Sequence, residues 1–244
     1  MVAGLDADVG LAGREVLDAA TGTGNTALAL ARAGANVHAF DLTPELLAIA
    51  QQRAADAGLP VAFREGDLLA IPFADDAFDV VVSTFGAFTA DDHRACVSEL
   101  IRVCRPGGLV VSTAWTRSGL FGALREIPIA RHPELWPPDR PDPGDWADPD
   151  RLIAMVAGLP VDVEVSTHGY PFWFPDVATA FGFFEEVSGP VQRIRAGVAD
   201  LGGDWEALRS EVLERWSQQG TVADGGIELN GVYGVARLRV HADR

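Results

Sequence analysis

The segment that most constrains the fold of this chain runs from Val16 to Ala27 and reads VLDAATGTGNTA. Apolar residues lead into two closely spaced glycines, Gly22 and Gly24, and a helical pattern follows them. Glycine lets a ligand approach the backbone because it has no Cβ, and the N-terminus of the following helix faces that ligand. The segment therefore predicts a strand, a ligand-binding turn and a helix in succession.

The stretch from Arg14 to about Ala114 repeats this alternation of short apolar runs and helical patterns. Such a repeat is typical of βα units on a mostly parallel sheet with buried central strands. The turn Arg105-Pro106-Gly107-Gly108 leads into the last strand of the stretch. The expected strands are 15–18, 36–40, 61–64, 78–83 and 109–114, and the expected helices are 25–33, 44–57 and 91–103.

The second half of the chain has a different pattern, beginning with a Pro- and Asp-rich stretch from Arg131 to Asp150 that predicts an irregular insertion. Beyond it we expect a strand at 161–174, helices at 176–187 and 204–218, and a strand or strand pair at 226–240. The chain is thus predicted to be an α/β protein with a seven-stranded, mostly parallel sheet, helices on both faces and a smaller C-terminal lid lobe. The expected divisions are a short N-terminal segment at 1–13, a core at 14–115, and the lid lobe with the last strands at 116–244.

Charge and composition narrow the range of partners. The net charge of the 244-residue chain is -16, and an acidic field of that size repels nucleic acids and anionic membrane surfaces. We therefore expect a small-molecule substrate. The N-terminus lacks a basic start followed by an apolar run, and no long apolar stretch occurs, so we expect a cytoplasmic protein. Cys96 and Cys104 have no metal-ligand spacing, so we expect free thiols and no metal.

Three acidic residues follow the first three expected strands, namely Asp18, Asp41 and Asp67. The carboxyl ends of parallel strands meet at one edge of a sheet, where open α/β folds bind their ligands. Asp41 can accept bonds from two ribose hydroxyls, and Asp67 can accept one from an adenine amino group. Each acid also suits a structural role, because aspartate commonly caps helices and turns.

The spacing Gly22-x-Gly24-x-x-Ala27 also fits a dinucleotide-binding fingerprint, with Asp41 at a suitable later position. Asp18 separates the two interpretations. A carboxylate beside the turn disfavours a pyrophosphate and suits a ligand that carries an ammonium and a sulfonium. The charge therefore favours an aminoacyl nucleoside over a dinucleotide.

Five motifs in sequence order resemble those of the class I S-adenosylmethionine-dependent methyltransferases, near the branch that acts on quinones and small natural products. They are the glycine loop, Asp41, Gly66-Asp67, the strand Phe78-Asp79-Val80-Val81 and Arg105-Pro106-Gly107-Gly108, and the resemblance covers about 14–115. It implies a Rossmann-like core in which Asp18 and the loop hold the methionine portion, Asp41 the ribose, and Leu42, Leu68 and Asp67 the adenine. The implied cofactor residues are Asp18, Ala20, Gly22, Gly24, Asn25, Asp41, Leu42, Gly66, Asp67, Leu68, Ser83, Thr84 and Phe85.

Two departures from the family pattern bear on function. Ala20 stands where the family has its first loop glycine, and its methyl group is tolerated if the backbone keeps a negative φ. The segment before the first strand is short, whereas family members usually carry helices there that close over the cofactor. We therefore expect another cover for the site, either a homodimer or a small partner subunit.

A sulfonium is already electrophilic, so the protein mainly has to align the acceptor and exclude water. A general base is needed only for a protonated acceptor, and the candidates are His93, His168 and Tyr170, each of which also suits an ordinary structural role. The candidate substrate-binding residues are Phe88, Trp115, Trp173 and Glu185, which equally suit core packing or a solvated surface.

The leading hypothesis is methyl transfer to a small, largely apolar acceptor through an O, N or C nucleophile. Ala20 and the short N-terminal segment motivate an alternative, in which a methyltransferase-like protein uses the same cleft for another nucleophilic displacement. Two further alternatives are an NAD(P)-dependent oxidoreductase, which Asp18 opposes, and a binding module without turnover.

Overall fold

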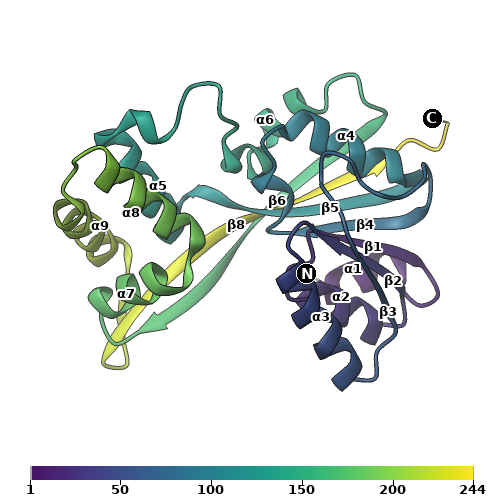
Figure 1. The fold of residues 1–244 in the computed structure, drawn as a ribbon, viewed down its shortest axis with the longest axis horizontal. Helices are drawn as coiled ribbons and strands as arrows, with labels where there is room; N and C mark the ends of the chain where they lie inside the picture. Colours follow the sequence, from purple (N-terminus) through teal and green to yellow (C-terminus); the bar gives the residue numbers. More distant parts are fainter. Residues whose placement is uncertain (1, 244) are drawn as a thin grey trace. The chain divides into compact units, whose positions relative to one another are not determined.

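The computed structural model describes residues 2–243 and shows an α/β protein with one mixed sheet (Figure 1). Its strand order is β3-β2-β1-β4-β5-β8-β6, and β7 pairs with β8 alone. The pairs β1–β2, β1–β4, β2–β3 and β4–β5 are parallel, as predicted. The seven strands of the main path match the expected number, and β7 is an addition. The strands are β1 (Glu15–Ala19), β2 (Asn36–Asp41), β3 (Val61–Glu65), β4 (Phe78–Thr84), β5 (Cys104–Ser118), β6 (Val161–Phe174), β7 (Thr221–Ala223) and β8 (Gly226–Val240).

The helices include all those expected, with ends shifted by one or two residues, and several that were not. The α-helices are α1 (Val2–Val9), α2 (Asn25–Arg32), α3 (Pro44–Asp56), α4 (His93–Val103), α5 (Gly119–Arg131), α6 (Pro149–Met155), α7 (Val177–Val187), α8 (Gly189–Asp200) and α9 (Trp205–Gln219). Short 3-10 helices occur at Ala87–Thr89, Pro133–Leu135 and Pro143–Ala147. The last two are the only helices between α5 and α6 in the described chain, so most of the segment 131–150 has the irregular structure that the sequence predicted. Among the described residues, no helix is both long and apolar enough to cross a membrane.

The chain divides into two compact units, each assembled from separate segments. The first unit comprises residues up to Ala114, Asp145–Ser166 and the described residues from Gly234 onward, and the second comprises Trp115–Gly144 and Thr167–Tyr233. The first unit thus also contains parts of the expected segments 1–13 and 116–244. Met1 and Arg244, which belong to the expected segments 1–13 and 116–244, lie outside the described residues.

The core of the first unit forms on both faces of the sheet. Val16, Val81 and Val110 of the central strands are fully buried. Figure 1 shows α1, α2 and α3 on one face of these strands and α4 and α6 on the other. The side chain of Asp92 caps α4 by accepting a bond from the backbone N–H of Ala95. The predicted coverage of both faces is therefore present.

The turn expected at Arg105–Gly108 lies inside a strand, which corrects the sequence prediction. β5 begins at Cys104, opposite Phe78, and the next registered pair is Val80 with Leu109. The extra residues form a bulge in which Gly107 has a φ of 76°. Gly107 and Gly108 indicate an irregular backbone, but glycines occur both in turns and in bulges, so the sequence does not distinguish the two.

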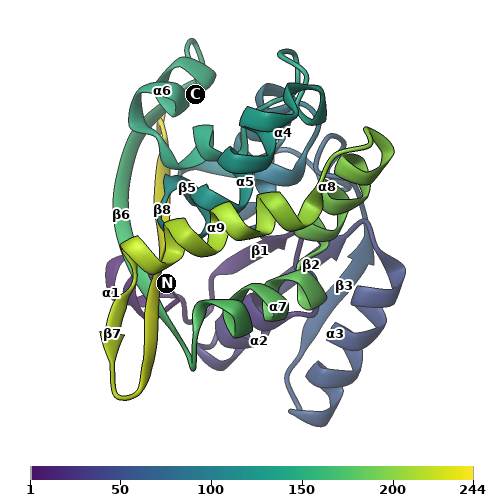
Figure 2. The same cartoon turned by 90° about the vertical axis from the view of Figure 1, so that its left-hand side faces the viewer.

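The second unit has an aromatic and aliphatic core of its own. Phe181 of α7 and Trp216 of α9 are almost fully buried, and the indole N–H of Trp216 donates to the backbone oxygen of Leu120 at 3.1 Å. β7 and β8 form a hairpin whose turn residues, Asp224 and Gly225, both have positive φ (Figure 2). An Asp-Gly turn of this kind matches the twist of the flanking strands.

Candidate functional site

A cavity of about 620 Å³ lies at the carboxyl ends of β1, β2 and β4, within the first unit. It is formed by the loops that follow β1, β2, β3 and β4, which is where parallel sheets bind ligands. Its lining residues are Ala20, Thr21, Gly22, Thr23, Asn25, Thr26, Phe40, Asp41, Leu42, Thr43, Gly66, Asp67, Leu68, Leu69, Thr84, Phe85, Gly86, Thr89, Ala90 and Asp91.

The glycine loop needs its glycines for two different reasons. Gly22 has a φ of 54°, and a Cβ there would enter open space, so the requirement is the left-handed backbone and free access to the cavity. Gly24 has a φ of 84°, and a Cβ there would lie 3.0 Å from the Cβ of Ala50 on α3. Gly24 thus allows α2 and α3 to pack closely, and Gly22 bares the backbone to a ligand.

Ala20 adopts a left-handed backbone, with a φ of 57°, so the negative φ named above as the condition for tolerating its methyl group is not present. An L-residue in that region is disfavoured by about 1–2 kcal/mol relative to its right-handed conformation. The surrounding fold accommodates the methyl group opposite Gly86, where a Cβ would lie only 2.6 Å from the Ala20 Cβ. Ala20 and Gly86 therefore form a complementary pair, and both line the cavity.

Asp41 joins the first two loops of the site. One carboxylate oxygen accepts the backbone N–H of Gly22 at 2.7 Å, and the other accepts that of Thr43 at 2.9 Å. Each carboxylate oxygen has a second lone pair, so both can accept a further bond from a ligand. Asp41 thus positions the glycine loop and presents acceptors to the cavity.

Asp18 lies beneath the glycine loop and does not line the cavity. Its side chain is 1% exposed and accepts the Thr21 hydroxyl at 2.6 Å. Burial raises the pKa of Asp18 to about 7, with a further contribution from the charge of Asp41, while bonds from Thr21 and the backbone of Ala27 oppose the rise. Asp18 therefore holds the loop and the first turn of α2, the structural role left open above. Its contact with a ligand stays a prediction.

The apolar part of the cavity lies at the ends of β2 and β3. Leu42 is 64% exposed although it is a large apolar residue, and the neighbouring Leu69 is also exposed. Asp67 accepts the backbone N–H of Leu69 at 2.9 Å, which shapes the turn after β3. A Cβ at Gly66 would lie 2.8 Å from Pro72, so the close packing of this turn requires glycine. An apolar face with a carboxylate beside it fits a flat nitrogenous ring.

The loop after β4 closes the site on its other side. The Ser83 hydroxyl donates to the backbone oxygen of Ala19 at 2.9 Å and accepts the N–H of Ala87 at 2.9 Å. Ser83 is fully buried and fixes the loop, whereas Thr84 and Phe85 line the cavity. The Thr26 hydroxyl donates to that of Thr84 at 3.0 Å, which links this loop to the start of α2.

Most of the cofactor residues expected from the sequence meet at this cavity. Three of them, Asp18, Gly24 and Ser83, support it from behind without lining it. Those that line it are Ala20, Gly22, Asn25, Asp41, Leu42, Gly66, Asp67, Leu68, Thr84 and Phe85. Their contacts with a cofactor stay predictions.

Sequence reasoning missed about as many lining residues as it found. The threonines of the loop were overlooked because a loop sequence does not reveal which side chains face a ligand. Gly86, directly after Phe85, carried a usable signal, since a glycine at a strand end often marks a close approach. The missed residues are Thr21, Thr23, Thr26, Phe40, Thr43, Leu69, Gly86, Thr89, Ala90 and Asp91.

The three candidate general bases do not line the cavity. His93, at the start of α4, is buried, and its Nε2 lies 3.1 Å from the backbone oxygen of Phe88. His168 and Tyr170 belong to the second unit, where His168 stacks on Tyr233 with ring centroids 5.5 Å apart and Tyr170 is 56% exposed. A catalytic role for any of them stays a prediction.

The expected substrate-binding residues are divided between the units. Phe88 packs against the core of the first unit. In the second unit, Trp115 packs on Phe121 with ring centroids 4.0 Å apart, and Trp173 is 54% exposed. Glu185 accepts the indole N–H of Trp205 at 2.7 Å and pairs with Arg195 at 2.9 Å. Glu185 thus already has two partners in the fold, and the substrate roles of all four residues stay predictions.

The family profile described as "Methyltransferase domain" matches residues 16–108, the stretch that supplies every lining residue of the cavity. One uncharacterised protein of Mycobacterium tuberculosis is 50% identical over 112 residues, which are 46% of this chain and 41% of that protein. A second is 36% identical over 205 residues, 83% of this chain and 74% of that protein. The chain thus spans less than half of the first relative and about three quarters of the second.

A demethylmenaquinone methyltransferase of Thermus thermophilus is 44% identical over 122 residues, 48% of this chain and 56% of that protein. Among solved structures, a putative methyltransferase of Bacillus halodurans is similar with a TM-score of 0.65 at 22% identity, covering 98% of this chain and 97% of that chain. This structural likeness shows the shared fold, so the expected Rossmann-like architecture is confirmed.

Proposed function

We propose that this chain, which belongs to the class I S-adenosylmethionine-dependent methyltransferase family, transfers a methyl group from S-adenosylmethionine to a small, largely apolar acceptor. The observation that carries the proposal is the charge of the cavity. Asp41, Asp67 and Asp91 line it, and none of the described residues contributes a basic side chain. Such a lining disfavours the pyrophosphate of a dinucleotide and suits a cofactor with an ammonium and a sulfonium.

Asp18 contributes little negative charge to the cavity. With a pKa of about 7, this buried carboxyl is partly protonated near neutral pH, so it attracts a cation less than an ordinary aspartate does. Asp41, Asp67 and Asp91 belong to the cavity lining itself and supply the negative charge there. They carry the preference for a cationic ligand.

The residues present fit S-adenosylmethionine in each of its parts. Asp41 has free acceptor capacity for the ribose hydroxyls beyond its two backbone bonds. Leu42 offers an uncovered apolar face for the adenine, with Asp67 placed to accept from the amino group. The bare backbone at Gly22 admits the aminoacyl portion close to the N-terminus of α2.

When bound, the sulfonium supplies an electrophilic methyl group, so the chain's own contribution is positioning. Asp41 bonds the glycine loop, and the Thr26–Thr84 bond fixes the loop after β4 relative to α2. Ala20 and Gly86 pack closely between these two loops, since a Cβ at Gly86 would lie 2.6 Å from that of Ala20. A site held in this way aligns the acceptor and lowers the entropic barrier to methyl transfer.

The choice of an apolar acceptor rests on the family branch. The Thermus thermophilus relative is named for demethylmenaquinone, and its similarity extends over 122 residues of this chain. The acidic character of the whole chain argues against nucleic-acid acceptors. We infer that the acceptor is a quinone-like or other small aromatic metabolite.

Isothermal titration with S-adenosylhomocysteine, followed by detection of S-adenosylhomocysteine formed from S-adenosylmethionine and a quinol panel, tests the proposal. We expect saturable binding and product formation. The absence of binding up to millimolar concentration would refute the cofactor assignment. Binding without methylated product from any acceptor would instead favour another nucleophilic displacement in the same cavity.

A further inference from the structure

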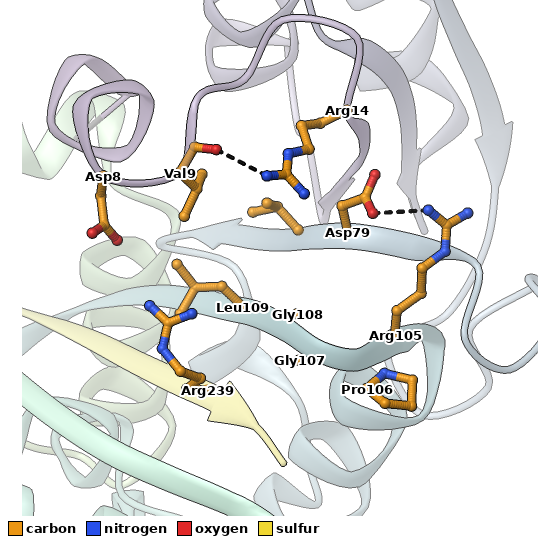
Figure 3. A pocket seen from close by; sticks show the side chains of 11 residues that line it. Asp8, Val9, Arg14, Asp79, Arg105, Pro106, Gly107, Gly108, Leu109 and Arg239 are labelled. Atoms are coloured by element: carbon orange, nitrogen blue, oxygen red, sulfur yellow. Dashed lines mark hydrogen bonds and ion pairs between the residues drawn. The ribbon is translucent and has the colours of Figure 1, made fainter. Parts of the chain in front are cut away.

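A second hollow, of about 340 Å³, lies at the opposite edge of the sheet in the first unit (Figure 3). It collects residues from the end of α1, the segment before β1, the start of β4, the bulge of β5 and the end of β8. Its volume is in the range of small-molecule sites. The lining residues are Asp8, Val9, Arg14, Asp79, Val80, Arg105, Pro106, Gly107, Gly108, Leu109 and Arg239.

The two carboxylates of this hollow already have partners. Asp79 accepts the backbone N–H of Glu15 at 2.9 Å and pairs with Arg105 at 2.8 Å. Although partial burial opposes the effect, these bonds and the nearby guanidinium of Arg14 hold the pKa of Asp79 below its usual value. Asp8 pairs with Arg237. Neither acid therefore attracts a further cation.

The three arginines of the hollow come from distant parts of the sequence and differ in what they do. Arg14 donates to the backbone oxygens of Val9 and Gly10, and Arg105 donates to Asp79 and to the backbone oxygen of Asp76 at 3.1 Å. Both arginines thus connect segments of the fold through these bonds, and both also line the hollow.

Arg239 is the exception among them. It is exposed and forms no hydrogen bond or ion pair with any of residues 2–243. Figure 3 shows its guanidinium beside Leu109, on the same side of the hollow as Asp8 and Val9. All five of its N–H donors are available to a ligand.

The guanidinium N–H groups in this hollow that have no partner within the fold are suited to bind an oxyanion. The chain carries a net charge of -16 with only 19 basic residues, yet three of these meet here. Arginine presents a planar fork that matches carboxylate and phosphate groups. We propose that the hollow binds a small oxyanion, the carboxylate or phosphate group of a metabolite, with Arg239 as its main anchor and Arg14 facing the same ligand.

Isothermal titration of the full chain with sodium citrate and, separately, with sodium phosphate at matched ionic strength tests the proposal. We expect saturable binding of one or both, and the tighter of the two identifies the group that the hollow prefers. Arg239→Gln should weaken that binding by about 10-fold or more, because a charge-assisted bond is lost.

The matched control is Arg151→Gln, which removes an exposed arginine of the same unit that lies outside the hollow. It alters the net charge equally, so it should leave the affinity unchanged. General salt stabilisation of the fold would affect the wild type and both variants alike. The proposal is overturned if the wild type shows no saturable binding, or if Arg239→Gln binds as tightly as the wild type. Since cofactor binding is not measured, the result is independent of the proposed function.

Discussion

The two edges of the parallel sheet in the first unit differ in charge: carboxylates line the cavity at one edge, whereas the hollow at the other is lined by three arginines and two carboxylates. At the carboxyl edge, Asp41 and Asp67 accept backbone N–H groups and turn their remaining acceptors toward the cavity. At the amino edge, Arg14 and Arg105 donate to backbone oxygens and turn their remaining donors toward the second hollow. The two proposals thus assign a cationic ligand to one edge of the sheet and an anionic ligand to the other.

The contrast follows from what each edge of a parallel sheet leaves unsatisfied. Helix N-termini lie at the carboxyl edge and expose N–H groups, which carboxylates satisfy. Helix C-termini and strand starts lie at the amino edge and expose backbone oxygens, which guanidiniums satisfy. The negative net charge of the chain does not predict the cluster of arginines in the second hollow. The following substitutions test the two edges, first through the affinity for a ligand and then through stability, where the largest expected effect comes first and the smallest last.

Asp41→Asn should weaken S-adenosylhomocysteine binding by about 100-fold, because the neutral amide loses charge-assisted bonds to the ribose and to the glycine loop. Isothermal titration measures the change. Glu65→Gln is the matched control, since Glu65 pairs in register with Asp41 on the neighbouring strand but lies outside the cavity. An equal loss of affinity in both variants would show that the total negative charge at this edge of the sheet, rather than the contact at Asp41, determines the affinity.

Asp18→Asn should change the pH dependence of stability. Because the folded pKa of Asp18, about 7, exceeds its ordinary value of 3.8, its stabilising contribution is complete below pH 3.8 and is lost as the pH rises through 7. The variant should therefore gain about 4 kcal/mol relative to the wild type between pH 4 and pH 8. Urea unfolding at several pH values measures this difference, and a flat difference would show that Asp18 is ionised throughout.

Gly86→Ala should reduce the free energy of unfolding by about 2 kcal/mol, because its Cβ would lie 2.6 Å from that of Ala20 and 2.9 Å from the Ser83 hydroxyl. Adding Ala20→Gly should restore about half of this loss, since the first contact is then removed. Gly182→Ala, in open space on α7, is the control and should not destabilise the protein. Additive losses in the double variant would disprove the coupling of the two loops.

Asp79→Asn, at the amino edge, should cost about 1 kcal/mol at neutral pH, because its pair with Arg105 is partly exposed. The pKa of Asp79 is lowered in the folded chain, so the stabilisation is present above the ordinary value of 3.8 and disappears at lower pH. Urea unfolding at pH 7 and pH 3 measures both values. A cost that persists at pH 3 would assign the effect to the bond with Glu15 instead of to charge.

The sequence predicted the first unit well because its central strands are buried and the limits of its helices have local signals. The residues Thr43 and Pro44 begin α3, and Gly34 and Gly58 have positive φ at the ends of α2 and α3. In the second unit, α5 contains Pro128 and α8 begins with Gly189 and Pro190, residues that usually indicate turns. Tertiary packing overrides that signal, as the burial of Leu120 and Val191 shows.

The sequence predicts those residues of the site that follow the ends of strands. It does not predict the backbone conformation or the burial of the residues in the glycine loop. Asp41 and Asp67 follow from the rule that ligands bind at the carboxyl edge. The left-handed Ala20 and the burial of Asp18 do not, because each results from contacts with segments far along the chain. Ala20 is accommodated by Gly86, and the pKa of Asp18 depends on complete enclosure.

The last strand, β8, has a consequence for the order in which the protein can be made and folded. Its residues Ala236, Leu238 and Val240 belong to the same buried core as Leu17 of the first strand. A ribosome synthesises them more than two hundred residues apart, so this core cannot be completed on a nascent chain until β8 has emerged. Until then, the apolar surface that β8 will cover stays exposed, and chaperone binding to the unfinished chain is expected at that surface.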